Sequence, residues 1–208
     1  MTMNRLKIDA QRNIKGVLFD FDGTLTYPGA LDFDSIRREM GCPENRPILE
    51  YIEAQDPSRR SLLLKILESK EEKAAEGSVP NRGAEKCLTT LKEKSTLIGI
   101  LTRNTLESVR LAMESFSSIT IEDFRAIITR ENSLPKPHPD GVYKAAVQMG
   151  ISTSELMMVG DFRFDVIAGK AAGAFSVLLT NNGGSVMTRD DPEPDYIVDN
   201  LSMILTLL

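Results

Sequence analysis

The sequence lacks the long apolar segments of membrane and secreted proteins. No apolar run reaches the roughly 20 residues that cross a bilayer, and the N-terminal segment MTMNRLKIDAQRN has no signal-peptide core. The only two cysteines, Cys42 and Cys87, lie far apart without metal-type spacing, which is typical of a chain with reduced thiols. We therefore expect a cytoplasmic protein that does not bind a membrane.

Clusters of basic residues are also missing. The chain has 25 Lys and Arg against 30 Asp and Glu, with a formal net charge of −5, and no Lys/Arg run that would mark a nucleic-acid interface. A nucleic-acid partner is therefore not expected. With 208 residues, 41% of them hydrophobic, the chain can build one core, or one core with a small added domain, and a monomer is expected at this size.

What the sequence does contain is an alternation of short apolar segments with helical patterns. Strands are expected at 14–20, 95–102, 124–129, 156–161, 174–180 and 195–199. Helices are expected at 82–94, 105–116, 139–150 and 164–173, with Asn104 as the N-cap of the second. This alternation predicts an α/β fold, a Rossmann-like three-layer arrangement in which helices cover both faces of a parallel sheet.

One region interrupts the alternation. Between Thr26 and Asn81 the sequence has no strand candidate, and the segment is too long for an ordinary loop. Its patterns are helical, at 32–40, 45–55 and 57–77. We expect a catalytic core at 1–26 and 82–208 with a helical cap domain inserted at 27–81. The alternative is that these helices simply pack on the sheet.

Polar side chains follow four of the predicted strands. They are Asp20 and Asp22 after the first strand, Thr102 after the second, Lys136 in the loop after the third, and Asp161 and Asp165 after the fourth. Each alone is explained by a turn, a cap or a solvated side chain. Because ligands bind beyond the carboxyl ends of parallel strands, the six together predict one site at that edge of the sheet.

The residue types at this edge indicate phosphoryl chemistry. Four neighbouring acids would raise one another's pKa, and a cation would relieve this repulsion. Oxygen ligands without nearby His or Cys favour Mg²⁺. A Mg²⁺ ion, a lysine and a hydroxyl together can receive phosphoryl oxygens, and a carboxylate can act as the nucleophile.

Four segments of the chain resemble the motifs of the haloacid dehalogenase (HAD) superfamily. They are DFDGTLT, the Thr at the end of the second strand, KPHP and GDFRFD, in the superfamily's order and around an inserted cap. The final segment EPDYIVDNLSMILTLL resembles the last strand and helix of the phosphoglycolate-phosphatase-like branch. The resemblance implies a Mg²⁺-dependent phosphatase that hydrolyses a small phosphate ester through an aspartyl-phosphate.

The resemblance also implies a role for each motif residue. Asp20 would attack phosphorus, and Asp22 would act as general acid and then as general base. Thr102 and Lys136 would bind the phosphoryl oxygens. The metal set would comprise Asp20, the backbone carbonyl of Asp22, Asp161, and Asp165 as a residue that orders metal-bound water or Lys136.

The sequence departs from the superfamily pattern in two places. Arg103 follows Thr102 where relatives often have Asn, and this arginine either binds substrate or projects into solvent. The cap is shorter than is typical of the branch. Its arginines are either solvated or bind an anionic part of the substrate; they are Arg37, Arg38, Arg59 and Arg60. No general-base role is assigned to His138, the only histidine.

Three functions other than a phosphatase share part of this pattern. A dehalogenase needs neither Asp22 nor Asp161, so their presence argues against it. A phosphomutase needs a cap that shields the aspartyl-phosphate from water, and the short cap argues weakly against one. A receiver-type signalling module also combines Asp, Mg²⁺, Thr and Lys, but it would be shorter and would lack the inserted cap.

Overall fold

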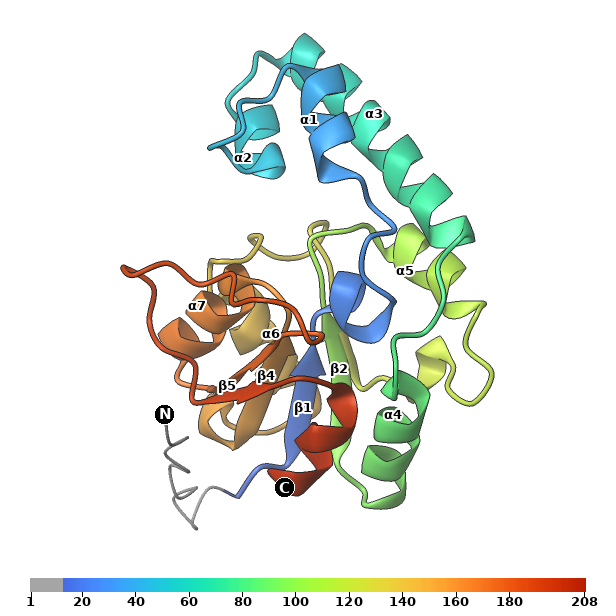
Figure 1. The fold of residues 1–208 in the computed structure, drawn as a ribbon, viewed down its shortest axis with the longest axis vertical. Coiled ribbons are helices and arrows are strands. Elements are labelled where there is room, and N and C mark those ends of the chain that lie inside the picture. The colour runs from blue at the N-terminus through green and yellow to red at the C-terminus, as the bar shows by residue number, and fades with distance from the viewer. Residues whose placement is uncertain (1–12) are drawn as a thin grey trace.

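A computed structural model of the chain describes residues 13–208, so the expectations for residues 1–12 lie outside the described residues. The centre of the fold is a six-stranded parallel sheet with the order β3-β2-β1-β4-β5-β6 (Figure 1). The strands are β1 Gly16–Phe19, β2 Leu97–Leu101, β3 Ala126–Ile128, β4 Leu156–Gly160, β5 Phe175–Leu179 and β6 Tyr196–Val198. All six predicted strands are confirmed, and so is the α/β class.

β1 lies at the centre of the sheet and is buried on both faces. Val17 pairs with Ile98 of β2 on one side and with Met157 of β4 on the other. Val17 contributes to one hydrophobic cluster and Leu18 to another, because successive side chains of a strand point to opposite faces. This double burial explains why the β1 sequence is a continuous apolar run.

Four helices cover the sheet, as the sequence predicts. They are α4 Ala84–Glu93, α5 Leu106–Met113, α6 Asp140–Met149 and α7 Arg163–Ala172. α4 and α5 contribute to the cluster on one face, and α6 and α7 to the cluster on the other, which gives three layers. The helix expected at the C-terminus is instead a 3₁₀ helix, Leu201–Thr206.

The inserted segment forms three helices above the sheet (Figure 1). They are α1 Phe33–Met40, α2 Ile48–Glu53 and α3 Pro57–Glu76. The C-terminal end of α3 reaches the core, where Ala75 joins the hydrophobic cluster that contains Val17. A hydrophobic cluster of their own holds the three helices together, and it includes Ile36, Met40, Ile52, Leu63 and Leu67. A separate core supports the cap interpretation over helices packed on the sheet, so we propose the domain division near residues 26 and 81.

The two connections between the cap and the sheet pair with each other. Thr26 and Pro80 form an antiparallel bridge, and the N–H of Tyr27 donates to the carbonyl of Val79 at 2.8 Å. The side-chain amide of Asn81 also donates to the carbonyl of Thr24 at 2.8 Å, in the turn that follows β1. The chain therefore leaves and re-enters the core at one place, beside the end of β1.

Candidate active site

The site lies at the carboxyl ends of β1, β2 and β4, where the chain order along the sheet reverses direction. After β1 the backbone turns sharply through Phe21–Leu25, and Gly23 has a positive φ of 73°. A glycine tolerates this conformation because it has no Cβ. The turn brings Asp20 and Asp22 to the edge of the sheet beneath the cap.

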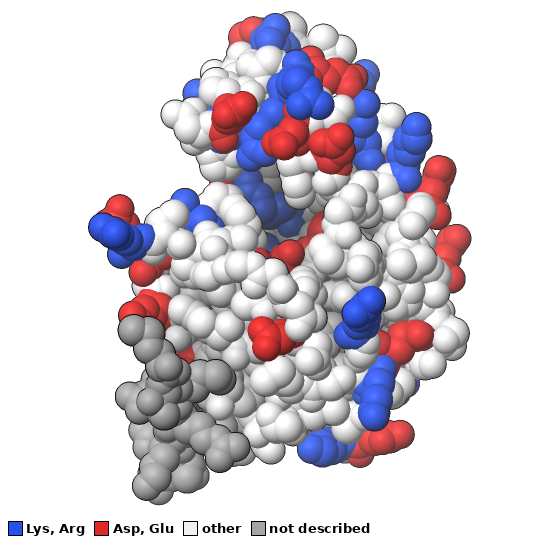
Figure 2. Space-filling model, viewed as in Figure 1, with Lys and Arg blue, Asp and Glu red and all other residues white. Residues whose placement is uncertain are grey.

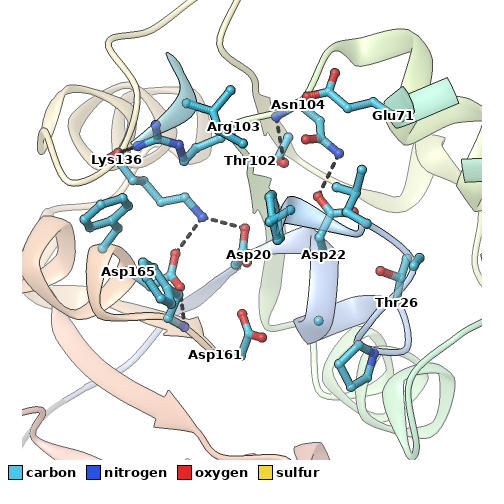
Figure 3. A pocket seen from close by; sticks show the side chains of 18 of the residues that line it. Asp20, Asp22, Thr26, Glu71, Thr102, Arg103, Asn104, Lys136, Asp161 and Asp165 are labelled. Carbon is cyan, nitrogen blue, oxygen red and sulfur yellow. Dashed lines mark hydrogen bonds and ion pairs between the residues drawn. The ribbon is translucent and has the colours of Figure 1, made fainter. Parts of the chain in front are cut away.

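Lys136 is the central cation of the site. Its Nζ donates to Asp20 Oδ1 at 2.5 Å and to Asp165 Oδ1 at 2.6 Å (Figure 3). Its side chain is only 3% exposed. Burial acts to lower the pKa of Lys136, but the ion pairs with Asp165 and Asp20 outweigh it and raise that pKa above its usual value. The lysine therefore stays charged throughout the neutral range.

Three acids gather around this lysine. Asp20, Asp161 and Asp165 each offer a carboxylate oxygen, and these atoms lie within 4.8 Å of one another. Burial, followed by the charges of Asp20 and Asp165, raises the pKa of Asp161 to about 8. Lys136 pairs with Asp20 and Asp165, which leaves Asp161 without a cationic partner among residues 13–208. The cluster thus holds more negative charge than its lysine balances.

The surroundings of Asp161 fit a divalent cation. The donor set consists of carboxylate oxygens, the ligands that hard cations prefer. Gly23 leaves room for the Asp161 carboxylate because it has no side chain. A Cβ at this position would lie only 2.2 Å from Asp161 Oδ2. The residues present can therefore bind a metal ion.

Asp22 has a different environment from Asp20. Its Oδ2 accepts a hydrogen bond of 2.7 Å from the side-chain amide of Asn104, and Lys136 makes no ion pair with it (Figure 3). Desolvation, followed by the charges of Asp20 and Glu71, raises the pKa of Asp22 to about 7. One carboxyl of the DFD segment is thus ion-paired, while the other exchanges a proton near neutral pH.

Asn104 is a site residue whose role the sequence does not predict. It was expected to cap α5, but the side chain of Thr105 caps that helix by accepting from Ser108 N at 3.2 Å. Asn104 is therefore free to reach Asp22, and its own N–H donates to Thr102 Oγ1 at 3.1 Å. Its place after Thr102 in the segment TRN was the one available signal.

Arg103 connects the core to the cap. Its guanidinium donates to Glu50 of α2 at 3.1 and 2.7 Å, donates to the carbonyl of Lys136, and lies over the ring of Phe164 at 5.1 Å. Arg103 also lines the cavity described below. Its predicted contact with substrate stays a prediction.

A second arginine anchors the long cap helix α3. Arg130, after β3, donates to both carboxylate oxygens of Glu71 at 2.6 and 2.7 Å and to the carbonyl of Arg103 at 3.1 Å. Glu71 is only 3% exposed, and its burial raises its pKa to about 7 although Arg130 opposes this. Local sequence patterns point to neither residue as part of the site. The pair places α3 next to Asp22.

A cavity of about 340 Å³ lies between the cap and the core. All the predicted site residues line it; they are Asp20, Asp22, Thr102, Arg103, Lys136, Asp161 and Asp165. Of the four cap arginines named above, Arg37 alone lines it. His138 is exposed and lies outside the lining, and its Nδ1 accepts from the N–H of Asp140 at 3.1 Å.

A family model described as haloacid dehalogenase-like hydrolase matches residues 26–179. The chain belongs to this hydrolase family. A haloacid dehalogenase-like hydrolase domain-containing protein of Arabidopsis thaliana is 30% identical and covers 100% of this chain and 89% of its own length. The similarity to this relative thus extends over both the core and the cap of the hydrolase.

Other relatives of the hydrolase have phosphatase names. A putative pyrophosphatase of Clostridium perfringens is 28% identical over 94% of this chain and 97% of its own length. A phosphoglycolate phosphatase of Neisseria meningitidis is 34% identical over 60% of this chain and 54% of its own. This hydrolase is therefore a phosphatase-like enzyme, as the sequence motifs predict.

A solved structure has the same fold. The crystal structure of a protein described as a predicted phosphoglycolate phosphatase, from Haemophilus somnus 129pt, aligns with a TM-score of 0.70 at 19% identity, covering 94% of this hydrolase and 98% of that chain. Within residues 13–208, no helix of the hydrolase is both long enough and apolar enough to cross a membrane.

Proposed function

We propose that this hydrolase is a Mg²⁺-dependent phosphatase that acts on a small phosphorylated metabolite through an aspartyl-phosphate on Asp20. The observation that carries the proposal is the difference between the two acids after β1. Asp20 is held by Lys136 at 2.5 Å, whereas Asp22 has a raised pKa of about 7. A nucleophile and a proton donor need these two opposite states.

In the first step, a carboxylate oxygen of Asp20 forms a bond to phosphorus and the bond from phosphorus to the ester oxygen breaks. Asp22 gives its proton to that oxygen, so the leaving group departs as an alcohol. Lys136 and Thr102 bind the phosphoryl oxygens whose charge must be stabilised. The raised pKa of Asp22 suits this step, since part of the population carries the proton at neutral pH.

In the second step, Asp22 takes a proton from a water molecule while the water oxygen bonds to phosphorus. The bond between phosphorus and Asp20 breaks, which releases inorganic phosphate and restores the carboxylate. Asn104 keeps the Asp22 carboxyl in place for both proton transfers through its 2.7 Å hydrogen bond. The net reaction is the hydrolysis of one phosphate ester by one water.

Magnesium is proposed as the metal of the acidic cluster. Asp20, Asp161 and the backbone carbonyl of Asp22 would hold it. Asp165 would lie behind these ligands, where it accepts a hydrogen bond from Lys136. When bound, Mg²⁺ supplies charge neutralisation for the phosphoryl oxygens. The uncompensated Asp161 supports this choice, as does the exclusively oxygen donor set.

Phosphate release from phenyl phosphate tests the proposal. We expect release with Mg²⁺, none with excess EDTA, and none from Asp20→Asn with Mg²⁺. Asp190→Asn, an exposed acid on a loop, is the matched control and should keep full activity. Release that persists in Asp20→Asn would contradict the nucleophile assignment.

Mass spectrometry of the intact protein tests the intermediate. Asp22→Asn removes both the acid of the first step and the base of the second, so the substrate is 4-nitrophenyl phosphate, whose leaving group departs as a stable anion without a proton. The second step still lacks a base, so the protein mixed with this ester should gain the mass of one phosphoryl group. The doubly substituted Asp20→Asn, Asp22→Asn protein should not gain it. A phosphorylated wild-type protein that never releases phosphate would instead favour a receiver-type function.

A further inference from the structure

The two walls of the cavity differ in chemistry. The core wall carries the acids, Lys136 and Thr102, which are the groups that handle phosphate. The cap wall is mainly apolar, and its large side chains are Leu31, Phe33, Ile48, Leu49 and Leu67. Since the phosphoryl group is fixed at the core wall, the rest of the substrate extends toward the cap wall.

The cap wall offers few hydrogen-bonding groups to a leaving group. Among the described lining residues from 27 to 81, the polar side chains are Tyr27, Arg37 and Glu71. Arg130 already occupies both oxygens of Glu71. A polyhydroxylated leaving group such as a sugar would therefore lose hydrogen bonds to water without replacement, which costs binding energy. The wall favours an apolar leaving group.

Four of the lining side chains are aromatic, and three of them have large exposed fractions. Tyr27, Phe33 and Phe162 are 47%, 50% and 43% exposed, although all three line the cavity. Aromatic side chains gain from contact with ring-shaped apolar groups beyond the area that they bury. A ring-sized leaving group would cover these side chains, whereas a two-carbon acid would not.

Arg37 is the only basic side chain among the described lining residues of the cap wall. Its Nε is buried and has no hydrogen-bond partner among residues 13–208. Its ion pair joins Nη1 to Asp34 Oδ1 at 3.9 Å, and the Asp34 side chain is 82% exposed, so this contact contributes little. The Nε is too buried to contact a ligand, so the donors that Arg37 can offer to the cavity are its two Nη nitrogens, which suit a carboxylate or phosphate.

The other cap arginines do not compete for this role. Arg59 donates to the carbonyl of Met40 at 3.5 Å, and Arg60 donates to the carbonyl of Glu53 at 2.7 Å, so both stabilise the cap itself. Arg38 is exposed and lies outside the cavity lining. Figure 2 shows Lys and Arg side chains in the hollow between the cap and the core, and the basic residues of the cavity lining are Arg37, Arg103 and Lys136.

We propose that the natural substrate is a phosphomonoester whose leaving group is apolar, ring-sized and anionic at its far end, where Arg37 binds it. This inference rests on the phosphatase function proposed above. Arg37 would then determine substrate specificity, and sugar phosphates and phosphoglycolate would be poor substrates.

Four esters separate the features of this substrate. 4-Carboxyphenyl phosphate has the ring and the distal anion, phenyl phosphate has only the ring, phosphoglycolate has only the anion, and glucose 6-phosphate has neither. We expect kcat/KM for 4-carboxyphenyl phosphate to exceed that for phenyl phosphate about tenfold, as for a hydrogen bond between charged groups. Glucose 6-phosphate and phosphoglycolate should both fall below phenyl phosphate.

Substitution of Arg37 tests whether this residue causes the preference for the ester with the distal carboxylate. In Arg37→Met the ratio of kcat/KM for 4-carboxyphenyl phosphate to that for phenyl phosphate should fall to about one. In Arg37→Lys, which keeps the charge but loses the planar fork, the ratio should be intermediate. The matched control is Arg38→Ala, the exposed neighbour on the same helix, which should keep the wild-type ratio.

The failure of this inference can be distinguished from the failure of the proposed function. Equal kcat/KM for the two aryl esters, or a ratio unchanged in Arg37→Met, would contradict the role of Arg37. Faster hydrolysis of glucose 6-phosphate or phosphoglycolate than of either aryl ester would contradict the apolar leaving group. No phosphate release from any of the four esters with Mg²⁺ would contradict the phosphatase proposal itself.

Discussion

Asn104 and Asp22, 82 residues apart in the chain, are joined by a 2.7 Å hydrogen bond from the side-chain amide to Oδ2. The amide orients the Asp22 carboxyl at the end of β1. Because it donates to the ionised form, it also acts to lower the pKa of Asp22, against the effects of burial and of Asp20. Asn104 is therefore a positioning residue for the proposed general acid.

Replacement of Asn104 should change the pH dependence of phosphate release. In Asn104→Ala the pKa of Asp22 loses a lowering influence, so the alkaline limb of kcat/KM against pH should move to higher pH while kcat falls about tenfold or more. Asn45→Ala, an exposed amide in the cap, should reproduce the wild-type profile. A lower kcat with an unmoved limb would indicate a merely structural role.

The stability of the metal-free protein should fall as pH rises. The folded-state pKa values of Asp161 and Asp165, about 8 and about 6, lie above the usual 3.8, so folding favours protonated carboxyls. Their stabilising contribution is complete below about pH 4 and is lost as pH rises toward 8. The Tm measured in EDTA should therefore decrease between pH 5 and pH 8.

Mg²⁺ should oppose this loss, because it binds the ionised cluster of the folded state. The Tm gained on adding Mg²⁺ should be larger at pH 8 than at pH 5. In Asp161→Asn, both the decrease of Tm with pH in EDTA and the increase of Tm on adding Mg²⁺ should become smaller. In Asp190→Asn, both should match the wild-type values. An increase of Tm on adding Mg²⁺ that is equal at pH 5 and pH 8 would contradict the metal assignment.

The Arg130–Glu71 pair should matter more for stability than the surface ion pairs. The two side chains are 9% and 3% exposed, so removal of one partner leaves a poorly solvated charge. Arg130→Met should destabilise the protein by about 3 kcal/mol, measured by chemical denaturation. The double replacement Arg130→Met, Glu71→Met should regain part of this loss. Lys70→Met, which breaks an exposed pair with Glu39, should cost less than about 1 kcal/mol.

The sequence predicted the sheet and the core wall of the site for one physical reason. Buried parallel strands need continuous apolar runs, and the polar residues that follow such runs must meet at one edge. The segments that end at Asp20, Thr102 and Asp161 satisfy this rule, so their grouping followed from local patterns. Lys136 was found in the same way, from its place after the third strand.

The contacts across the cavity could not be predicted from local patterns. Glu50 meets Arg103 across 53 residues of chain, and Glu71 meets Arg130 across 59. These pairs depend on how the cap is placed over the sheet, to which the paired connections at Thr26 and Pro80 and the packing of Ala75 on the core contribute. A helix-surface glutamate gives no sign in the sequence of which arginine it will face.

Gly23 offers a sharp test of the space around Asp161. A Cβ at this position would lie 2.2 Å from Asp161 Oδ2, whereas a Cβ on Gly29 would meet nothing within 4 Å. Both glycines have positive φ, 73° and 95°, so alanine at either position should cost a similar backbone strain of about 1–2 kcal/mol. Gly23→Ala should in addition displace the Asp161 carboxylate and raise the Mg²⁺ concentration needed for half-maximal phosphate release about tenfold or more. Gly29→Ala should lose stability but keep the wild-type Mg²⁺ requirement, and equal Mg²⁺ requirements in the two variants would remove Asp161 from the proposed metal site.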